Sequence, residues 1–379
     1  MNITIICDVL GEANNGTSLA AFNLIRHLKS KGHNVTVVAP DAPDEEGFVS
    51  VPSLDLTFML NWALRLNDVV LAKPDKQLLA DAIRDADVVH LLVPLPLSVA
   101  AVRIAKEMDK PVTASFHCQA ENVTAHFGLM DFSFANNATY EAFYKLVYRY
   151  CDCVHYPTEM IRRIFERAVG HKTNAYVISN GVNDSFVPPS QPPHNDKFTI
   201  VCSGRYSREK AQQQLLKAVA ISKHKDEIRV ILAGDGPRGS YLKALANRFD
   251  IDATFAFFSR DKMVKTLQNA DLYVHTAIIE IEAIACMEAI CCGAVPVICN
   301  SPRSATRFFA IGDNSLYEQY DIEDLASKID YWFEHPEEKA ERSKEYDATR
   351  RSFSQRECME KMEAMLTDAV RINEKNYLL

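Results

Sequence analysis

Two glutamates, with seven residues between them, have the types and spacing to bind and act on a polar ligand. Glu280 lies in a loop, and Glu288 lies in the stretch Ala283–Cys292, which is long enough for a helix and is followed by Gly293. The first turn of a helix presents unpaired N–H groups that favour an anion, and carboxylates accept hydrogen bonds from hydroxyls. A nucleotide sugar, with its diphosphate and hydroxyls, fits this pattern.

The simpler interpretation of the two glutamates is structural. Glu280 would interact with the helix dipole, and Glu288 would lie on a solvated face of the helix. The composition around Glu288 argues against this, because the surrounding helix is apolar at Ile284, Ala285, Met287, Ala289 and Ile290. Glu288 is therefore predicted to be buried, and a buried carboxylate needs a partner.

The neighbouring elements are predicted to bring both glutamates to one edge of a sheet. Apolar runs at Leu272–His275 and Val295–Cys299 are typical of short buried strands, and the helix lies between them. A strand–helix–strand unit makes the strands parallel and the crossover right-handed. The loop with Glu280 then lies at the carboxyl edge of the sheet, where α/β proteins bind ligands.

Arg205 and Lys210 form a second candidate group. They follow a predicted strand at Phe198–Cys202, so they lie at the same kind of sheet edge and can converge on a diphosphate. Two isolated cations in a loop would most simply be solvated; beside the glutamate pair we expect them to bind an anion. The later turn Gly234–Pro237 is interpreted as structural only.

With these residues the sequence resembles the family-4 retaining glycosyltransferases of the GT-B type. Glu280, Glu288, Gly293 and Pro296 match the family's two glutamates seven residues apart, followed by a small-residue helix, Gly and a strand after Pro. The resemblance implies that Glu280 lies by the donor-sugar hydroxyls as a catalytic residue and that Glu288 holds the ribose. The family's Gly-Phe-Gly is replaced here by 281–283, Ile-Glu-Ala, which leaves the donor sugar open.

The resemblance extends to the cationic loop and to both halves of the chain. The family's Gly-Arg-x4-Lys-Gly implies that Arg205 and Lys210 neutralise the departing diphosphate, although Ala211 replaces the last Gly. Three of the positions that the resemblance implies also have structural explanations. Phe258 could be a core residue, Gly16 could belong to an ordinary helix-entry loop, in which Asn15 stands in place of the family's first Gly, and His117 could be a structural histidine. The implied donor-binding residues are Gly16, Arg205, Lys210, Phe258, Ala283, Ile284, Ala285 and Glu288, and His117 joins Glu280 as a catalytic residue against the donor sugar.

Alternating strand and helix patterns along the chain predict an α/β fold of two Rossmann-like, doubly wound domains. The GT-B resemblance implies that these domains face a central cleft. The expected ranges are an N-terminal acceptor-side domain at 1–187, a proline-rich linker at 188–197, a nucleotide-sugar-binding domain at 198–353, and a terminal helix at 354–379. The linker is placed by its two Pro-Pro pairs, and the resemblance implies that the last helix crosses back to the first domain.

Composition excludes several classes of function. A net charge of −8 argues against nucleic-acid binding, which needs a basic face. No apolar run approaches the roughly 18 residues of a membrane span, and a strand begins at Ile3 without a preceding basic segment, so no signal peptide is expected. Ten cysteines, mostly inside apolar elements, are typical of reduced thiols, and a cytoplasmic location is expected.

No cofactor and no metal site are predicted. Asp85-Ala-Asp87 spells the Asp-x-Asp of metal-dependent glycosyltransferases, but it ends a helix before the strand Val88–Leu92, at the amino edge of the sheet. Cys151, Cys153 and the pair Cys291-Cys292 lack His partners at zinc-ligand spacing. We therefore expect transfer without a metal, with the diphosphate charge balanced by cations and a helix N-terminus.

The segment from Phe127 to Tyr150 is rich in aromatic residues and has nearby cations at Lys145, Arg149 and Arg162-Arg163. One interpretation is an amphipathic surface that meets the inner face of the cell membrane. Packing in the core of the first domain is the competing interpretation, favoured by the sparse positive charge.

The sequence and the resemblance together predict a retaining hexosyltransferase that moves a hexose from a nucleotide sugar, expected to be UDP-linked, to a hydroxyl of an acceptor glycan or lipid. Such an activity suits glycolipid or cell-surface polysaccharide synthesis. Two alternatives stay open, since several motif positions depart from the family: a nucleotide-sugar-binding subunit without transferase activity, and a nucleotide-sugar epimerase on the same scaffold.

Overall fold

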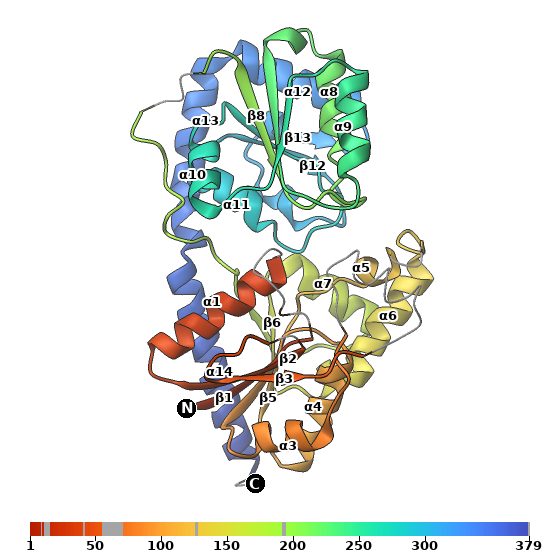
Figure 1. Cartoon of the computed structure of the whole chain (residues 1–379), viewed down its shortest axis with the longest axis vertical. Coiled ribbons are helices and arrows are strands. Elements are labelled where there is room, and N and C mark those ends of the chain that lie inside the picture. Colours follow the sequence, from red (N-terminus) through yellow and green to blue (C-terminus); the bar gives the residue numbers. More distant parts are fainter. Residues whose placement is uncertain are drawn as a thin grey trace. The chain divides into compact units, whose positions relative to one another are not determined.

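The computed structural model describes residues 1–8, 10, 16–40, 42–54, 71–125, 128–191 and 195–377. The chain forms two compact units, each with its own parallel sheet (Figure 1). The first unit consists of Met1–Asn180 and Arg356–Leu379, and the second of Gly181–Gln355. Both are Rossmann-like, as predicted.

The sheet of the first unit has seven strands in the order β3-β2-β1-β4-β5-β6-β7, and neighbouring strands are parallel. Its central strands are buried at every position because helices cover both faces of a parallel sheet. Strand β3 was not predicted; it is an edge strand and is only partly buried. The bounds are β1 Asn2–Ile6, β2 Asn34–Pro40, β3 Phe48–Val51, β4 Val88–Leu91, β5 Val112–Ser115, β6 Cys153–Tyr156 and β7 Ala175–Val177.

The helices of this unit connect successive strands. Helix α6 covers Ser133–Leu146, and the 3₁₀ turn η1 covers Tyr148–Tyr150. Between them Val147, with a φ of −132°, ends the α-helix. The other helices are α1 Gly16–Ser30, α3 Lys76–Arg84, α4 Pro96–Glu107, α5 Ala120–Ala125 and α7 Glu159–Val169.

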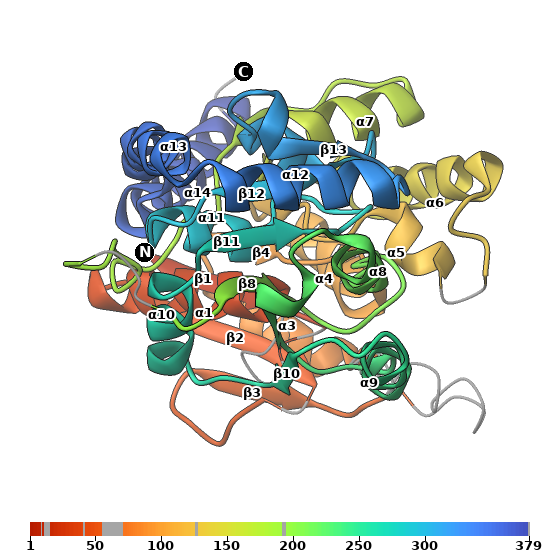
Figure 2. The ribbon, with the colours of Figure 1, turned by 90° about the horizontal axis from the view of Figure 1, so that it is seen from above.

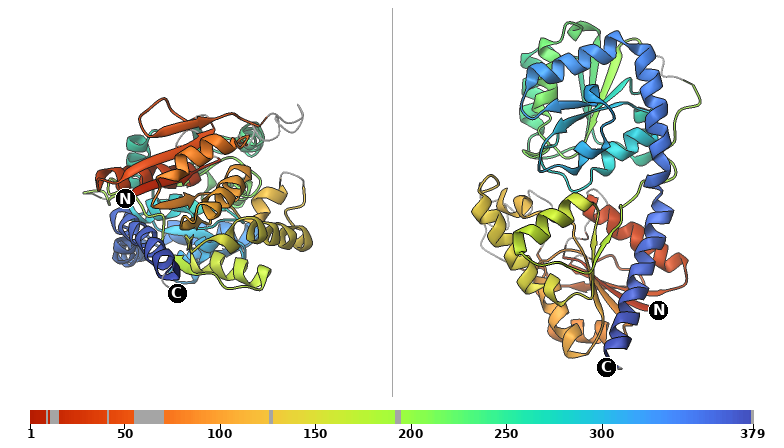
Figure 3. Two further views of the ribbon diagram at one scale, coloured as in Figure 1. Left: turned by 90° about the horizontal axis from the view of Figure 1, so that it is seen from below. Right: turned by 180° about the vertical axis from the view of Figure 1, so that it is seen from behind.

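Helix α14 (Gln355–Tyr377) completes the core of the first unit (Figure 3). Its buried side chains join those of β1, β2 and α1 in one apolar cluster, and Met365 and Leu366 are fully buried there. The Glu363 carboxylate bonds to the rings of His27 and His33, at 2.9 and 2.8 Å. Among the described residues, no helix is both long and apolar enough to cross a bilayer.

The sheet of the second unit repeats the same winding with six parallel strands in the order β10-β9-β8-β11-β12-β13. In both units the chain starts in the middle, winds to one edge and then returns to build the other half. The edge strand β13 was not predicted, as its three residues have no clear period. The bounds are β8 Phe198–Ser203, β9 Ile228–Ala233, β10 Ala253–Ala256, β11 Leu272–His275, β12 Pro296–Asn300 and β13 Leu316–Glu318.

Helices again link the strands of the second unit, and α8 packs against α12 beside the sheet (Figure 2). Short 3₁₀ turns, η2 Lys225–Glu227, η3 Ala305–Phe309, η4 Asp313–Ser315 and η5 Arg350–Phe353, fill the connections. The helix bounds are α8 Gln213–Ile221, α9 Gly239–Arg248, α10 Arg260–Gln268, α11 Ile284–Cys291, α12 Ile322–Glu334 and α13 Pro336–Thr349.

The boundary between the units lies at Asn180–Gly181, before the proline-rich segment at which we expected a linker. Val182 already belongs to the second unit, since its N–H donates to the Phe353 carbonyl at 2.7 Å. The first two prolines of the expected linker pack inside that unit: a Cβ built on Gly293 would lie 3.7 Å from both Pro188 and Pro189. The segment is thus anchored at the end of α11.

Candidate active site

The strand order of the second unit creates a switch point between β8 and β11. The two strands pair in parallel, with Leu272 opposite Ile200 and Tyr273 opposite Val201, so their carboxyl ends lie side by side. The loop after β8 contains Arg205 and Lys210, and the loop after β11 contains Glu280. Open α/β sheets bind ligands outside the carboxyl ends of such a pair.

Lys210 and Glu280 are in direct contact at this point, with the Lys210 ammonium donating to Oε2 of Glu280. Neighbouring bonds fasten their two loops together. The Thr276 hydroxyl donates to the Lys210 carbonyl at 2.7 Å, and the Ile278 N–H donates to the Glu209 carbonyl at 2.8 Å. Two residues that the sequence predicted in separate loops are therefore brought together as one ion pair.

The electrostatics of the pair keep both groups charged. Burial by itself would raise the pKa of Glu280, but the Lys210 ammonium and the His275 ring outweigh it and lower that pKa to about 2. For Lys210, burial acts to lower the pKa, and the Glu280 carboxylate more than reverses it. The site therefore presents an anion and a cation in contact at the sheet edge across the neutral pH range.

The turn Gly234–Pro237 positions the loop that contains Arg205. A Cβ on Gly234 would lie only 2.1 Å from the Gly204 carbonyl oxygen, so only glycine allows this approach. The Tyr206 N–H donates to the Asp235 carbonyl at 2.8 Å, and the Gln212 side chain donates to the Arg205 carbonyl at 2.8 Å. The glycine turn thus positions the loop of Arg205 through contacts of its backbone.

Both loops of the site contain an alanine in the left-handed region. Ala211 follows Lys210 with a φ of 51°, and Ala283 precedes α11 with a φ of 63°. An L-residue pays roughly 1–2 kcal/mol for this conformation, because its Cβ crowds the following carbonyl. At Ala283 the conformation turns the chain into α11, whose first residues, Ile284 and Ala285, are half-buried. Their N–H groups belong to a first helical turn and have no carbonyl partner within the helix.

Glu288 lies in the middle of α11 and is half-buried, so the expectation of full burial was too strong. The residue occupies the helix face that is left partly open, whereas Met287 and Ala289 are buried on either side. Desolvation raises the pKa of Glu288 to about 7, and the nearby Arg260 opposes that shift only in part. Glu288 is thus poised to change charge near neutrality.

The remaining predicted residues lie at other places. Phe258 follows β10, the edge strand of the second sheet; it is half-buried, with the Lys262 ammonium 6.0 Å from its ring, and is not a core residue. His117 follows β5 in the first unit, with its ring centroid 5.6 Å from that of His155, and burial holds its pKa well below the usual range. Gly16 is the first residue of α1, and 11–15 lie outside the described residues.

Sequence reasoning missed one residue beside the ion pair and one buried residue in the loop that follows Glu280. His275, the last residue of β11, is buried with Nε2 at 3.7 Å from Glu280 Oε2, and Glu282 is buried in the following loop. A signal existed for His275, because it ends a predicted strand at the carboxyl edge of a sheet, and His117 was singled out for following a strand at such an edge. Nothing in the pattern around Glu282 distinguishes it from a solvated loop residue.

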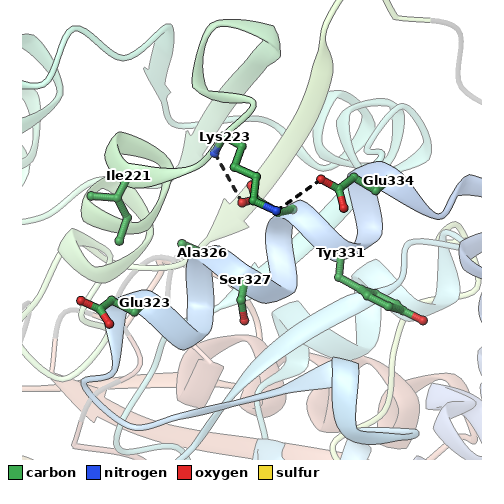
Figure 4. A pocket seen from close by; sticks show the side chains of 8 residues that line it. Ile221, Lys223, Glu323, Ala326, Ser327, Tyr331 and Glu334 are labelled. Atoms are coloured by element: carbon green, nitrogen blue, oxygen red, sulfur yellow. Dashed lines mark hydrogen bonds and ion pairs between the residues drawn. The ribbon is translucent and has the colours of Figure 1, made fainter.

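A separate pocket lies where α8 ends beside α12 (Figure 4). Since α8 starts near the carboxyl edge of the sheet, its end lies toward the amino edge, away from Lys210. Asp87, of the rejected Asp-x-Asp, also lies at an amino edge, where its carboxylate accepts from the Asn2 N–H at 2.7 Å. No group of three or more His, Cys, Asp or Glu side chains able to hold a metal occurs in the described ranges. The pocket is lined by Ile221, Lys223, Glu323, Ala326, Ser327, Asp330, Tyr331 and Glu334.

Two Rossmann-like units with these parallel sheets form the GT-B fold, and HepE of Anabaena, solved with UDP and glucose, superposes with a TM-score of 0.75. HepE is 16% identical, with 97% of this chain and 100% of HepE covered. Two family models match adjoining parts of the sequence: "Glycosyltransferase Family 4" over 14–186 and "Glycosyl transferases group 1" over 184–350. Together the two models cover 14–350, and the chain belongs to the GT4-type glycosyltransferases that they describe.

Two further similarities are found. A GDP-mannose-dependent alpha-mannosyltransferase of Corynebacterium glutamicum is 24% identical over 311 residues, which cover 79% of this chain and 72% of the relative. The catalytic domain of a cholesterol-alpha-glucosyltransferase of Helicobacter pylori is 44% identical over 41% of this chain and 99% of that domain, with a TM-score of 0.41.

Replacing alanine by glycine should change the stability of the second unit in opposite directions at two positions, Ala283 before α11 and Ala289 inside it. Replacing Ala283 by Gly relieves the left-handed conformation and should raise the free energy of unfolding of the second unit by about 1 kcal/mol. The same change at Ala289, buried inside α11, should lower it by roughly 1 kcal/mol or more. Urea unfolding, followed by the buried Trp332 with Trp62 replaced by Phe, measures both. Equal effects of the two changes would contradict the argument.

Proposed function

We propose that the chain is a retaining hexosyltransferase that takes a hexose from a nucleotide sugar, UDP-linked in the first instance, and works without a metal. The observation that carries this proposal is the Lys210–Glu280 pair at the switch point between β8 and β11. It offers a cation for a diphosphate next to an ionised carboxylate for sugar hydroxyls, at the position where such sheets bind ligands.

Different residues of the second unit have different roles in the proposed reaction. Lys210 and Arg205 stabilise the charge on the diphosphate as its bond to the anomeric carbon breaks. Glu280 accepts hydrogen bonds from the sugar hydroxyls and Glu288 from the ribose, while the N–H groups at Ile284 face the diphosphate. His117 is the residue of the first unit that the family resemblance assigns to the donor sugar.

Transfer itself replaces one bond by another. The bond between the anomeric carbon and the diphosphate oxygen breaks, and the acceptor oxygen attacks from the same face of the ring, so that the configuration is retained. The acceptor proton passes to the departing diphosphate, which is the strongest base released. Binding energy from the nucleotide holds the two reacting centres together.

Replacing Lys210 by Ala tests this assignment. It removes the cation for the leaving diphosphate, so kcat/KM for the donor should fall by roughly 10² to 10³. The matched control is Lys217→Ala, which removes an exposed lysine from α8 and should leave turnover unchanged. Mass spectrometry of donor-by-acceptor mixtures gives the rates, with UDP- and GDP-hexoses as donors and oligosaccharides, diacylglycerol, a sterol and a lipid-linked glycan as acceptors. NMR of the product reports its anomeric configuration.

The same assay separates the alternatives. Donor binding without transfer to any acceptor would favour a nucleotide-sugar-binding subunit. An isomer of the donor without an acceptor adduct would favour an epimerase. Transfer that survives Lys210→Ala unchanged would overturn the proposed role of the pair, and inversion at the anomeric carbon would overturn retention.

The raised pKa of Glu288 predicts a pH dependence of donor binding. The ionised carboxylate accepts hydrogen bonds from ribose hydroxyls more strongly than the protonated acid does, so affinity for the donor should weaken as the pH falls through 7, by up to about tenfold per pH unit. A nucleotide sugar is the suitable probe, because its diphosphate does not titrate in this range. Glu288→Gln should bind more weakly and show a flat profile in calorimetry between pH 6 and 8; a profile like that of the wild type would exclude Glu288 as the titrating group.

We further propose that helix α6 contacts the surface of an anionic membrane, on its cytoplasmic face. The aromatic segment divides into two parts: Tyr140, Phe143 and Tyr148 are buried in the core, whereas other apolar side chains are exposed. We call the exposed set the α6 face. It consists of Leu129, Phe132, Phe134, Leu146 and Tyr150, of which Phe132 and Phe134 are 61% and 87% exposed.

Exposed cations lie next to the α6 face. Lys145 and Arg149 belong to the same segment, and α7, which packs against α6, adds Arg163 and Arg167. Two of these cations have acidic partners, Glu141 for Lys145 at 2.9 Å and Glu159 for Arg163 at 2.8 Å, which reduces their attraction to anionic lipid. Apolar insertion therefore supplies most of the expected affinity.

Vesicle sedimentation tests the membrane contact. Phe134→Ser combined with Leu146→Ser should weaken binding to vesicles of phosphatidylcholine and phosphatidylglycerol by roughly tenfold, since about 1.4 kcal/mol or more of apolar burial is lost. Phe308→Ser is the matched control, because Phe308 is 69% exposed in the second unit. Equal loss in both variants, or no binding by the wild type, would exclude the α6 face as the contact.

A further inference from the structure

A row of buried polar groups leads to the candidate ion pair from inside the second sheet. The Ser203 hydroxyl lies 3.0 Å from the Tyr273 hydroxyl, which lies 3.4 Å from Nδ1 of His275. Nε2 of the same ring points to Glu280 Oε2 at 3.7 Å. Ser203, Tyr273 and His275 are all buried, and none has a part in the function proposed above.

The partners in this row determine which ring nitrogen has the proton. Burial lowers the pKa of His275 against the opposing effect of Glu280, so the ring is neutral. The ionised Glu280 carboxylate opposite Nε2 can only accept, which favours the tautomer with the hydrogen on Nε2; Nδ1 then accepts from the Tyr273 hydroxyl, which accepts in turn from Ser203. A neutral His275 therefore presents an N–H to the carboxylate that Lys210 already contacts.

This N–H is unused in the structure. A separation of 3.7 Å is too long for a hydrogen bond, and within the described part of the chain Nε2 has no other hydrogen-bond partner. Buried donors are nearly always paired, because an unpaired one loses its water without a replacement. A shift of under about 1 Å by Glu280 would bring this pair to normal hydrogen-bond length.

We propose that His275 is a positioning residue that takes over the Glu280 carboxylate when Lys210 turns to an anionic ligand. The proposal rests on the proposed function for the identity of that ligand, the diphosphate of the donor. Lys210 has one ammonium group, and a diphosphate at the same sheet edge competes with Glu280 for it. When Lys210 leaves, Oε2 binds the His275 N–H, and Oε1 remains free to accept a sugar hydroxyl.

The exchange explains how Glu280 stays ionised in a donor complex. Without Lys210 and without a replacement, burial would act to raise the pKa of Glu280, and a protonated carboxylic acid is a weaker acceptor for sugar hydroxyls than a carboxylate. A neutral imidazole N–H supports the anion without adding a second cation. The charged and titratable groups around this exchange are Lys210, Glu209, Glu280, Glu288, Tyr273, Cys202 and Cys286.

Kinetics of two variants test the exchange in the intact chain. His275→Leu removes the N–H, so kcat should fall at least tenfold, with less than a threefold change in the Kd of the nucleotide diphosphate that Lys210 holds. In a Glu288→Gln background, which removes the titration near pH 7, the acidic limb of the pH–rate profile should move up by one pH unit or more. His275→Gln, which offers an amide N–H near the position of Nε2, should restore most of both. Wild-type kinetics in His275→Leu, or no rescue by Gln, would overturn the proposal.

A second measurement needs no donor and therefore separates this inference from the proposed function. In Lys210→Ala, Glu280 is released without a ligand, so ¹⁵N NMR should show His275 bound to it, with a pKa above the wild-type value. The urea midpoint of Lys210→Ala/His275→Leu should fall by more than the sum of the single shifts. Unchanged His275 resonances and additive midpoints would overturn the exchange. If these results appear but no donor reacts, only the proposed function fails.

Discussion

The contact between Lys210 and Glu280 is the interaction on which the rest of the second unit depends. A buried ion pair adds little net stability, because desolvation of the two charges offsets their attraction. Its importance is therefore positional: it holds the loops after β8 and β11 together at the switch point of the sheet. Three other features adjoin this pair. They are the glycine turn after β9, the left-handed residues Ala211 and Ala283 before α8 and α11, and the buried row of Ser203, Tyr273 and His275 behind Glu280.

Regular elements were predictable from the sequence, and the contacts between loops were not. Central strands such as β4 and β11 are mostly apolar and fully buried, so their position and parallel pairing follow from pattern. The edge strands β3 and β13 were missed because they are only partly buried and each has an exposed polar residue, Ser50 and Glu318. For the site, strand ends identified Lys210 and Glu280, but their direct contact depends on loop geometry that no periodicity encodes. The half-buried state of Glu288 depends likewise on which helix face is left uncovered.

The same two loops each contain a residue with a strained backbone conformation. Ala211 and Ala283 adopt a conformation that glycine would adopt at lower cost, and both adjoin residues of the ion-pair site. Alanine limits the alternative conformations of a loop more than glycine does, so a strained alanine keeps a loop in one shape. We infer that the rigidity of these two loops is more important for the site than the small loss of stability that the left-handed alanines cause.

The composition of the first core has a consequence for synthesis on the ribosome. Met365 and Leu366 of α14 complete the apolar cluster that begins with Ile3, so this core joins the start of the chain to residues near its end. The whole of the second unit is translated between them and can fold as soon as it emerges. The unit that begins first is thus the last to be finished, and until then its uncovered sheet is a surface that chaperones would have to shield.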